Sequence, residues 1–327
     1  MSRAAPHCIR HRSPLDKAVF FRYNRHKARQ IKLKRGTELE HEIPNAIEET
    51  IVGKFRRSIW TKFLKGIREY QLIREGDRVA VCISGGKDSM LTAKCMQRLQ
   101  RYSKVPFETE YIVMDPGYAP ENRQRILDNA ERLGIPIHIF DTRIFRAVDK
   151  IEQNPCYLCA RMRRGHLYQH AQSLGCNKIA LGHHFDDVIE TILMGMLYGS
   201  QVQTMMPKIH SENFAGMELI RPMYLVREAD VIKWAEYNDL HFIRCACSVT
   251  QKNVTCETGG SKRQEVKQLL AQLRRVSPAI DMNIFRSVEN VNLNTIISYH
   301  SGEEYHHFLD TYDEGVTNHG TKAGEGR

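Results

Sequence analysis

The stretch RVAVCISGGKDS, residues 78–89, joins a short run of apolar and β-branched residues to a glycine-rich loop. The run is typical of a parallel strand that is buried on both faces. The residues from about Ser89 to Arg101 then follow a helical pattern. Such a strand–loop–helix unit places backbone N–H groups and the positive end of a helix around an anion. The stretch therefore predicts a phosphate-binding loop at the edge of an α/β sheet.

The residue types in this loop suit a chain of phosphates. Glycines allow positive φ and let bare N–H groups approach an anion closely. Lysine adds a point charge, the serines add hydroxyls, and Asp88 is a candidate ligand of Mg²⁺. The spacing fits neither GxxxxGK[ST] nor GxGxxG. A glycine turn without a ligand is the alternative, and the strand and helix on either side disfavour it. The candidate ATP-binding residues here are Ser84, Gly85, Gly86, Lys87, Asp88 and Ser89.

The segments that follow alternate between strand-like and helix-like patterns. Strands are expected at 110–114, 135–140, 178–181 and 218–220, and helices at 121–133, 157–174, 186–197 and 227–237. This alternation predicts βαβ units, and hence a Rossmann-like twisted parallel sheet with helices on both faces.

Regions outside the predicted sheet complete the domain organisation. Upstream, apolar residues recur every four positions from 43 to 73, which indicates one long amphipathic helix or two. Downstream, a helix is expected at 261–275. The expected divisions are a basic arm at 1–42, a helical region at 43–75, the ATP-binding α/β domain at 76–225, a C-terminal helical region with a cysteine cluster at 226–312, and a flexible tail at 313–327.

Composition limits the classes of protein. The 327 residues are 42% hydrophobic, and the mean hydropathy is −0.46. No apolar run approaches the roughly 18 residues that a membrane span needs, and no apolar stretch follows the basic N-terminus as in a secretory signal. We therefore expect a cytoplasmic protein without a membrane partner. The nine cysteines agree, because thiols in a reducing compartment serve packing, metal binding or redox chemistry.

The positive charge is concentrated at one end. Residues 1–35 hold eleven Lys and Arg against a single acid, Asp16, while the formal net charge of the whole chain is +10. Such an arm can neutralise phosphates and release counterions, which favours a polyanionic partner. A disordered tail without a function is an equally open interpretation.

The cysteines fall into two groups. Cys156 and Cys159 form a CxxC pair that enters a predicted helix bearing Arg163. Cationic neighbours and a helix N-terminus favour thiolates, the form that binds metal. The pair alone leaves zinc, an iron–sulfur cluster and a redox dithiol open. Further ligands could come from Cys245, Cys247 and Cys256. The remaining four, Cys8, Cys82, Cys95 and Cys176, are interpreted as buried or incidental thiols.

A second dense motif is LGHHFDDVIET, residues 181–191. Gly182 and His183 fall at the carboxyl end of a predicted strand, where open α/β sheets bind ligands. Asp186 and Asp187 then begin a helix. Acids at that position can be simple caps and dipole partners. A phosphate loop on a neighbouring strand favours work on Mg²⁺ or substrate instead.

In combination these motifs closely resemble the tRNA 2-thiocytidine synthetase family of the PP-loop ATP pyrophosphatases. The resemblance runs from about residue 75 to 291 and is carried by SGGKDS, PCYLCARMRRGHLY, LGHHFDDVIET, QTMMPKI, LIRPMYLV and FRSVENV. It implies the Rossmann-like fold of adenine nucleotide alpha hydrolases. It also implies adenylation of C2 of a tRNA cytidine, cytidine-32 of the anticodon loop, by ATP and Mg²⁺, followed by replacement of the oxygen with sulfur.

The resemblance also implies roles for particular residues. A 4Fe–4S cluster would be held by Cys156, Cys159 and one downstream cysteine. The family's second pair is usually CxxC followed by GSQ, whereas this chain has Cys245-Ala-Cys247, so Cys245 is expected as third ligand with Cys247 in reserve. Met114 joins the nucleotide contacts. Catalytic roles fall to Lys87, Asp88, Arg163 and Asp187. A cysteine desulfurase or sulfide would supply sulfur, and a homodimer is one expected form.

Other functions stay open at this level. One is a zinc-containing adenylating enzyme of the tRNA lysidine synthetase type. Another is a thiolase of a different RNA base or a small molecule, which the altered CAC cluster favours. A third is a binding module without enzymatic activity. A histidine- and glutamate-rich segment at 300–307 could suggest a metal site, but a solvated tail helix is the expected structure there.

Overall fold

The computed structural model describes residues 39–142, 144–145, 155–243 and 262–312. A six-stranded sheet forms its centre, with the strand order β3-β2-β1-β4-β6-β5. Neighbouring strands are parallel except for β5, which pairs antiparallel with β6 at one edge. The strands are β1 (Arg78–Ile83), β2 (Glu108–Asp115), β3 (Ile137–Asp141), β4 (Lys178–Ala180), β5 (Lys208–His210) and β6 (Glu218–Ile220).

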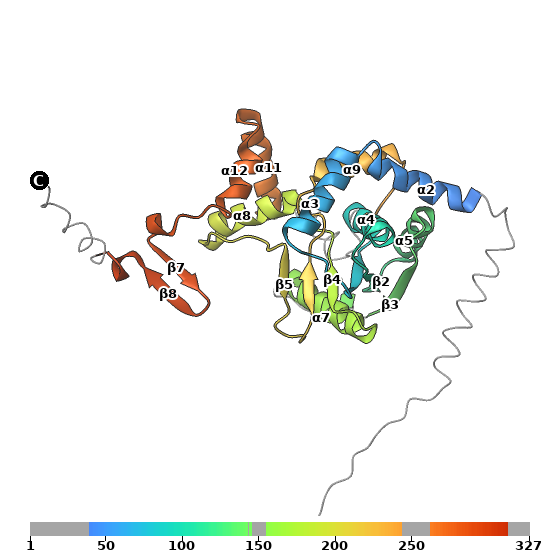
Figure 1. The fold of residues 1–327 in the computed structure, drawn as a ribbon, viewed down its shortest axis with the longest axis horizontal. Helices are drawn as coiled ribbons and strands as arrows, with labels where there is room; N and C mark the ends of the chain where they lie inside the picture. The colour runs from blue at the N-terminus through green and yellow to red at the C-terminus, as the bar shows by residue number, and fades with distance from the viewer. Residues whose placement is uncertain (1–38, 143, 146–154, 244–261, 313–327) are drawn as a thin grey trace, which may run out of the picture.

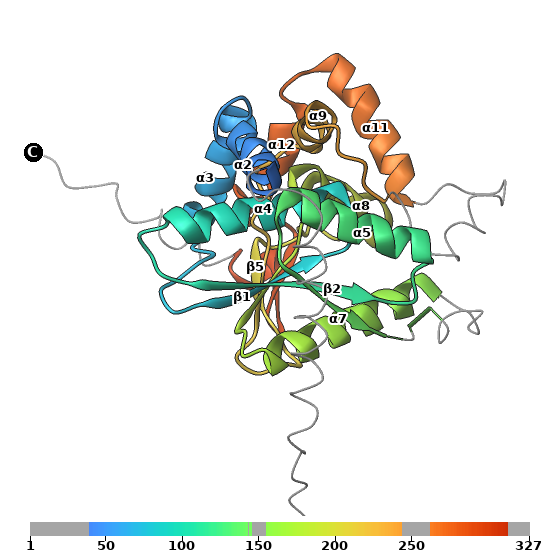
Figure 2. The same ribbon diagram turned by 90° about the vertical axis from the view of Figure 1, so that its right-hand side faces the viewer.

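Helices cover both faces of the sheet (Figure 2). On one face lie α4 and α5, with α2, α3 and α9 packed outside them, and α7 lies on the other. Helix α8 packs against α11 and α12. The helices are α2 (Leu39–Val52), the π-helix η1 (Arg56–Trp60), α3 (Thr61–Glu69), α4 (Lys87–Tyr102), α5 (Pro120–Leu133), α7 (Pro155–Ser173), α8 (Phe185–Gly199), α9 (Glu228–Tyr237), α11 (Lys262–Val276), α12 (Ile280–Ser287) and the short 3₁₀ turns η2 (Leu293–Thr295) and η3 (Phe308–Asp310).

The strand order explains where a ligand can bind. From β1 the chain winds through β2 to β3 on one side, then returns to place β4 on the other side of β1. The connections after β1 and β4 thus diverge, which opens a crevice at the carboxyl ends of these two strands. SGGKDS begins at the end of β1, and LGHHFDD follows β4. The two motifs therefore meet at the topological switch point.

The outer helix α2 is attached to the sheet domain by a buried ion cluster. Glu48 and Lys94 are each 2% exposed, and their charged atoms lie 2.9 Å apart. Arg98 and Arg101 of α4 reach the second carboxylate oxygen at 3.0 and 3.1 Å. Burial lowers the pKa of Lys94, and Glu48 opposes that effect. This single carboxylate thus neutralises cations along one side of α4.

Most of the predicted elements are present, and α12 is an additional helix within the expected C-terminal helical region. Edge strand β5 was not expected, and the segment around His300 is a β-hairpin rather than the expected tail helix. The hairpin joins β7 (Ser298–Ser301) to β8 (Glu304–His307) and lies apart from the sheet (Figure 1). Gly302 has φ +65° in its turn, and Tyr299 stacks on His306 across the strands at 4.7 Å. A left-handed glycine and cross-strand aromatic pairs favour a hairpin over a helix.

No helix in the described ranges is both long enough and apolar enough to traverse a bilayer.

Candidate active site

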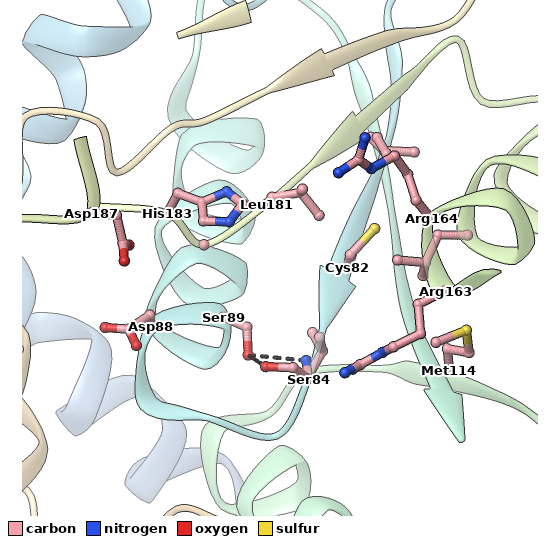
Figure 3. Close-up of a pocket in the computed structure, with 14 residues that line it drawn as sticks. Cys82, Ser84, Asp88, Ser89, Met114, Arg163, Arg164, Leu181, His183 and Asp187 are labelled. Atoms are coloured by element: carbon pink, nitrogen blue, oxygen red, sulfur yellow. Dashed lines mark hydrogen bonds between the residues drawn. The ribbon is translucent and has the colours of Figure 1, made fainter. Parts of the chain in front are cut away.

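A cavity of about 400 Å³, here called the first cavity, lies at the switch point. Its volume is within the range of roughly 300–1,000 Å³ that small-molecule sites occupy. Three separate elements border it: the loop after β1, the segment after β4, and helix α7 (Figure 3). The residues predicted from the sequence that line it are Ser84, Asp88, Ser89, Met114, Arg163, Gly182, His183 and Asp187.

The loop is held in shape by its own serines. The Ser84 N–H donates to Ser89 Oγ at 3.1 Å, the two hydroxyl oxygens lie 3.2 Å apart, and Ser89 Oγ is 3.0 Å from the Gly86 carbonyl (Figure 3). Gly85 has φ +84°, and a Cβ there would lie 2.6 Å from Cγ1 of Ile126. The loop thus turns sharply into the N-terminus of α4, where the helix dipole favours an anion.

Gly182 allows the second motif to approach the first. A Cβ at this position would lie 2.8 Å from the backbone N of Ser89 and 2.9 Å from the carbonyl carbon of Asp88. Real Cβ atoms do not come so close to backbone atoms, so only glycine lets the end of β4 contact the first turn of α4. This contact sets the spacing between the phosphate loop and the His183–Asp187 segment.

The side chain of Lys87 borders a different cavity from its neighbours. Its Nζ lies 3.0 Å from both Asp88 Oδ2 and Glu228 Oε1. The second cavity, about 790 Å³, lies between the loop and α9 and adjoins the first through Ser84 and Asp88. Burial would lower the pKa of Lys87, but the two carboxylates outweigh it and the pKa is raised. Lys87 is therefore a cation, and it is paired within the protein.

The two aspartates after β4 have different surroundings. Asp187 forms a capping box with buried His184, since each side chain accepts the other residue's N–H, at 3.3 and 3.0 Å. Asp187 also lines the first cavity, so capping and ligand binding are compatible. Asp186 is buried, accepts the Glu228 N–H at 2.7 Å and pairs with Arg274 at 2.7 Å. Asp186 is thus a structural residue.

His183 presents a neutral imidazole. Its Nδ1 is buried and has no hydrogen-bond partner among the described residues. Burial is the main cause that lowers its pKa to about 4, with Arg221 acting in the same direction. A neutral ring whose nitrogen has no partner can donate a hydrogen bond to a bound molecule or accept one from it. Because it carries no charge, it does not compete with phosphate groups for cations.

The pH dependence of stability tests this burial. Because the folded pKa of His183 is below the unfolded value, the unfolded state binds more protons as the pH falls from about 6.5 to about 4. Stability contributed by the neutral ring is therefore complete above pH 6.5 and is lost on acidification, by up to about 1.4 kcal/mol per pH unit. Urea unfolding from pH 7 to 4.5 should show a shallower loss in His183→Gln. His210→Gln, at an exposed ring, should match the native protein.

Helix α7 contributes one face to the first cavity. Arg163 extends from it towards Ser84 in Figure 3. Cys159, one turn earlier, is half-buried and packs near Met114, which also lines the cavity. Cys156 is in the first turn of α7, and only its backbone is described. The structure thus places the CxxC helix against the candidate nucleotide site, whereas Cys245, Cys247 and Cys256 lie outside the described residues.

Three other cysteines are buried, as predicted. Burial raises the pKa of Cys82 to about 12 and that of Cys176 to about 11, and raises the pKa of Cys95 as well. Such thiols stay protonated near neutral pH and are poor metal ligands. Among the described residues, no three His, Cys, Asp or Glu side chains gather as a metal site. Asp88 and Asp187 both line the first cavity, and carboxylate oxygens are of the ligand type that Mg²⁺ prefers.

Sequence reasoning did not single out Glu228. It begins α9, pairs with Lys87 across 141 positions of the chain, and reaches Lys267 of α11 at 3.3 Å with its other oxygen. The signal available was weak: an acid at a helix N-terminus reads as a dipole partner. Only the fold shows that this helix start faces the phosphate loop.

Comparison with known proteins finds a matching family model and several similar sequences. A family model described as a PP-loop domain matches residues 56–252. The tRNA-cytidine(32) 2-sulfurtransferases of Alcanivorax borkumensis, Vibrio campbellii and Geobacter sulfurreducens are 34%, 37% and 34% identical to this chain. The alignments cover 75%, 73% and 69% of this chain and 84%, 79% and 87% of those proteins.

A solved structure shares the fold. The U34-tRNA thiolase NcsA from Methanococcus maripaludis, solved with its 4Fe–4S cluster, superimposes with a TM-score of 0.55 over 70% of this chain and 77% of its own, at 21% identity. The family match covers more than half of the chain, and the relatives are covered over more than two thirds of their length. The chain therefore belongs to the tRNA-cytidine 2-sulfurtransferase family, the tRNA 2-thiocytidine synthetases of the PP-loop superfamily.

Proposed function

We propose that this protein uses ATP to replace the C2 oxygen of a tRNA cytidine, cytidine-32 of the anticodon loop, with sulfur. The observation that carries the proposal is the convergence on one cavity of the phosphate loop, the segment after β4 and the CxxC helix. The phosphate loop would bind the ATP that activates the C2 oxygen. The CxxC helix would hold the group that brings sulfur to the same cavity. The relatives that match most of the chain carry the same activity in their names.

The first step is adenylation of the base. The cytidine C2 oxygen attacks the α-phosphorus of ATP, and the bond to the β-phosphate oxygen breaks, so that pyrophosphate leaves. Backbone N–H groups of the loop, the hydroxyls of Ser84 and Ser89, and the guanidinium of Arg163 would stabilise the charge on the phosphates. Asp88 and Asp187 would hold Mg²⁺ between them and the phosphate oxygens. Sulfide then attacks the activated C2 carbon, and AMP leaves with the former C2 oxygen.

The residues of α7 fit an iron–sulfur cluster. Cys156 and Cys159 are three positions apart in a helix and so share a face. They are in its first turns, where the dipole favours thiolates. Together with Cys245 as third ligand, or Cys247 in its place, they would hold a 4Fe–4S cluster, which would supply sulfur chemistry beside the nucleotide site. Arg163, one turn after Cys159, would orient the phosphates next to these thiolates.

The remaining features of the proposal concern its setting. Anticodon-loop bases are unpaired, so one can enter the cavity at low unstacking cost. The basic segment at 1–35 would contribute phosphate contacts along the tRNA. Sulfide or a cysteine desulfurase would supply the sulfur in the reducing cytoplasm, and a homodimer is the assembly we expect.

A reconstituted reaction tests the function. Purified anaerobically and given ATP, Mg²⁺, sulfide and unmodified tRNA, the protein should form one AMP and one pyrophosphate per 2-thiocytidine. Nucleoside mass spectrometry measures the product, and tRNA with uridine at position 32 is the matched control. AMP formation without thiolated cytidine would contradict the proposed acceptor.

Iron content tests the cluster separately. Cys156→Ala and Cys159→Ala should each remove the iron that the anaerobic protein carries and leave ATP binding intact, because the phosphate loop is a different element. Cys176 is a buried thiol just before β4 in the chain, and Cys176→Ala should keep the full iron content. One zinc per chain in place of iron would favour a lysidine-synthetase-like enzyme.

A further inference from the structure

Lys87 is the cation that the phosphate loop offers, yet in this structure it has two protein partners. Asp88, at 3.0 Å, is its neighbour in the chain and belongs to the same loop. Glu228 comes from α9, and its Oε1 lies 3.0 Å from Lys87 Nζ. A nucleotide's phosphate oxygens must therefore compete with the Glu228 carboxylate for the same ammonium group.

The backbone of Glu228 is anchored at the start of α9, whereas Lys87 has a long flexible side chain. The Glu228 N–H donates to buried Asp186 at 2.7 Å. Asp186 is in turn fixed by Arg274 at 2.7 Å and Arg227 at 3.3 Å. The start of α9 is thus anchored to α8 and α11, so the lysine is the partner that can turn away.

The other oxygen of Glu228 already has a second cation. Lys267 Nζ of α11 lies 3.3 Å from Glu228 Oε2 and 3.6 Å from Glu190 Oε1. If Lys87 leaves, Lys267 can compensate the carboxylate without moving far. His184, the N-cap residue of α8, places its Nε2 3.9 Å from Glu228 Oε1. Although burial opposes it, the hydrogen bond and charge of Lys87 lower the pKa of Glu228 to about 2, so the carboxylate is ionised at any physiological pH.

We propose that Glu228 is a positioning residue that holds Lys87 until a nucleotide polyphosphate displaces it, and that Lys267 then takes up the released carboxylate. Because Glu228 competes with phosphate, it weakens the binding of ATP and of pyrophosphate alike. By recapturing Lys87 after the α–β bond has broken, it promotes the release of pyrophosphate. The proposal depends on the proposed function in one respect, that the nucleotide bound at the loop is ATP.

Calorimetric titration with α,β-methylene-ATP and with pyrophosphate tests the competition without RNA, sulfur or iron. Glu228→Gln should bind both at least about fivefold more tightly than the native protein, the low end of measured coupling between sites. In turnover, KM for ATP and kcat should both fall, since product leaves more slowly. Glu236→Gln, on the same helix and the same cavity wall, should match the native protein. Unchanged or weaker binding by Glu228→Gln would overturn the proposal, and would point to a ligand or structural role.

A double-mutant cycle tests the role of Lys267. Lys267→Met should weaken binding of the analogue about fivefold, because Lys87 is then the remaining lysine partner of Glu228 among the described residues. In the Glu228→Gln background the same change should have no effect. An equal effect in both backgrounds would mean that Lys267 acts on the phosphates directly.

If Glu228→Gln fails to fold, Glu228→Asp replaces it. The shorter side chain of aspartate cannot reach Lys87, so this variant should also bind the analogue more tightly. Absence of analogue binding by the native protein would contradict the ATP site itself.

Discussion

Replacing Gly182 with alanine is expected to lower kcat/KM for ATP by about 100-fold, the cost of displacing bound groups by about 1 Å. The added methyl would lie 2.8 Å from Ser89 N and 2.9 Å from the carbonyl carbon of Asp88. Both are backbone atoms in the first turn of α4, so no side chain can rotate to make room. The helix start must move away from β4, which spreads the N–H groups that should surround the phosphates. A stability loss of about 1–3 kcal/mol should accompany it.

Gly165 provides the matched control on a neighbouring helix. A Cβ there would meet no atom of another described residue within 4 Å outside its own helix backbone, so Gly165→Ala should retain activity and add up to about 1 kcal/mol of stability. Titration calorimetry with the methylene analogue and thermal unfolding measure both effects. Native ATP affinity in Gly182→Ala would mean that the spacing between β4 and α4 does not control the site.

Replacing Glu48 with alanine should destabilise the protein by about 3–5 kcal/mol, the usual cost of leaving a buried charge without its partner. Lys94, which is 2% exposed in the native protein, would lie next to Arg98 and Arg101 with its main counter-charge gone. Since small proteins are stable by only about 5–15 kcal/mol, much of the stability would be lost. Urea unfolding followed by circular dichroism measures the change.

The neighbouring Glu49 controls for charge alone. It is 65% exposed and pairs with Arg98 at 2.8 Å, so Glu49→Ala should cost no more than about 1 kcal/mol. The double variant Glu48→Leu with Lys94→Met should recover much of the loss, because two apolar side chains need no counter-charge. Equal losses from Glu48→Ala and Glu49→Ala would show that burial of the cluster contributes nothing.

The position of the site could be predicted because its parts follow strands. SGGKDS ends β1 and LGHHFDD follows β4, and adjacent parallel strands bring their carboxyl ends together. The sequence also predicted that Arg163 and the CxxC pair share a helix. That α7 presents Arg163 to the phosphate loop follows only from the packing of this helix against the sheet.

What could not be predicted depends on contacts between distant segments. The pairing of Glu228 with Lys87 needs α9 to begin beside the loop, and no local pattern encodes that distance. At 298–307 the polar composition suggested a solvated helix, while Gly302 and the paired rings across the strands produce a hairpin. The choice of Cys245 over Cys247 as the third cluster ligand stays a prediction, because sequence spacing alone does not say which thiol faces Cys159.

The attachment of the flanking helices has a practical meaning for expression and engineering. The family model spans residues 56–252, yet α2 ends before it and α11 begins after it. Each is connected through buried acids, Glu48 on one side and Asp186 on the other. A fragment cut at the family boundaries would leave Lys94 without Glu48 and Asp186 without Arg274. We therefore expect a fragment of residues 39–287 to be more stable than one cut at the family boundaries, and chimaeras with relatives to tolerate exchange of that longer range better.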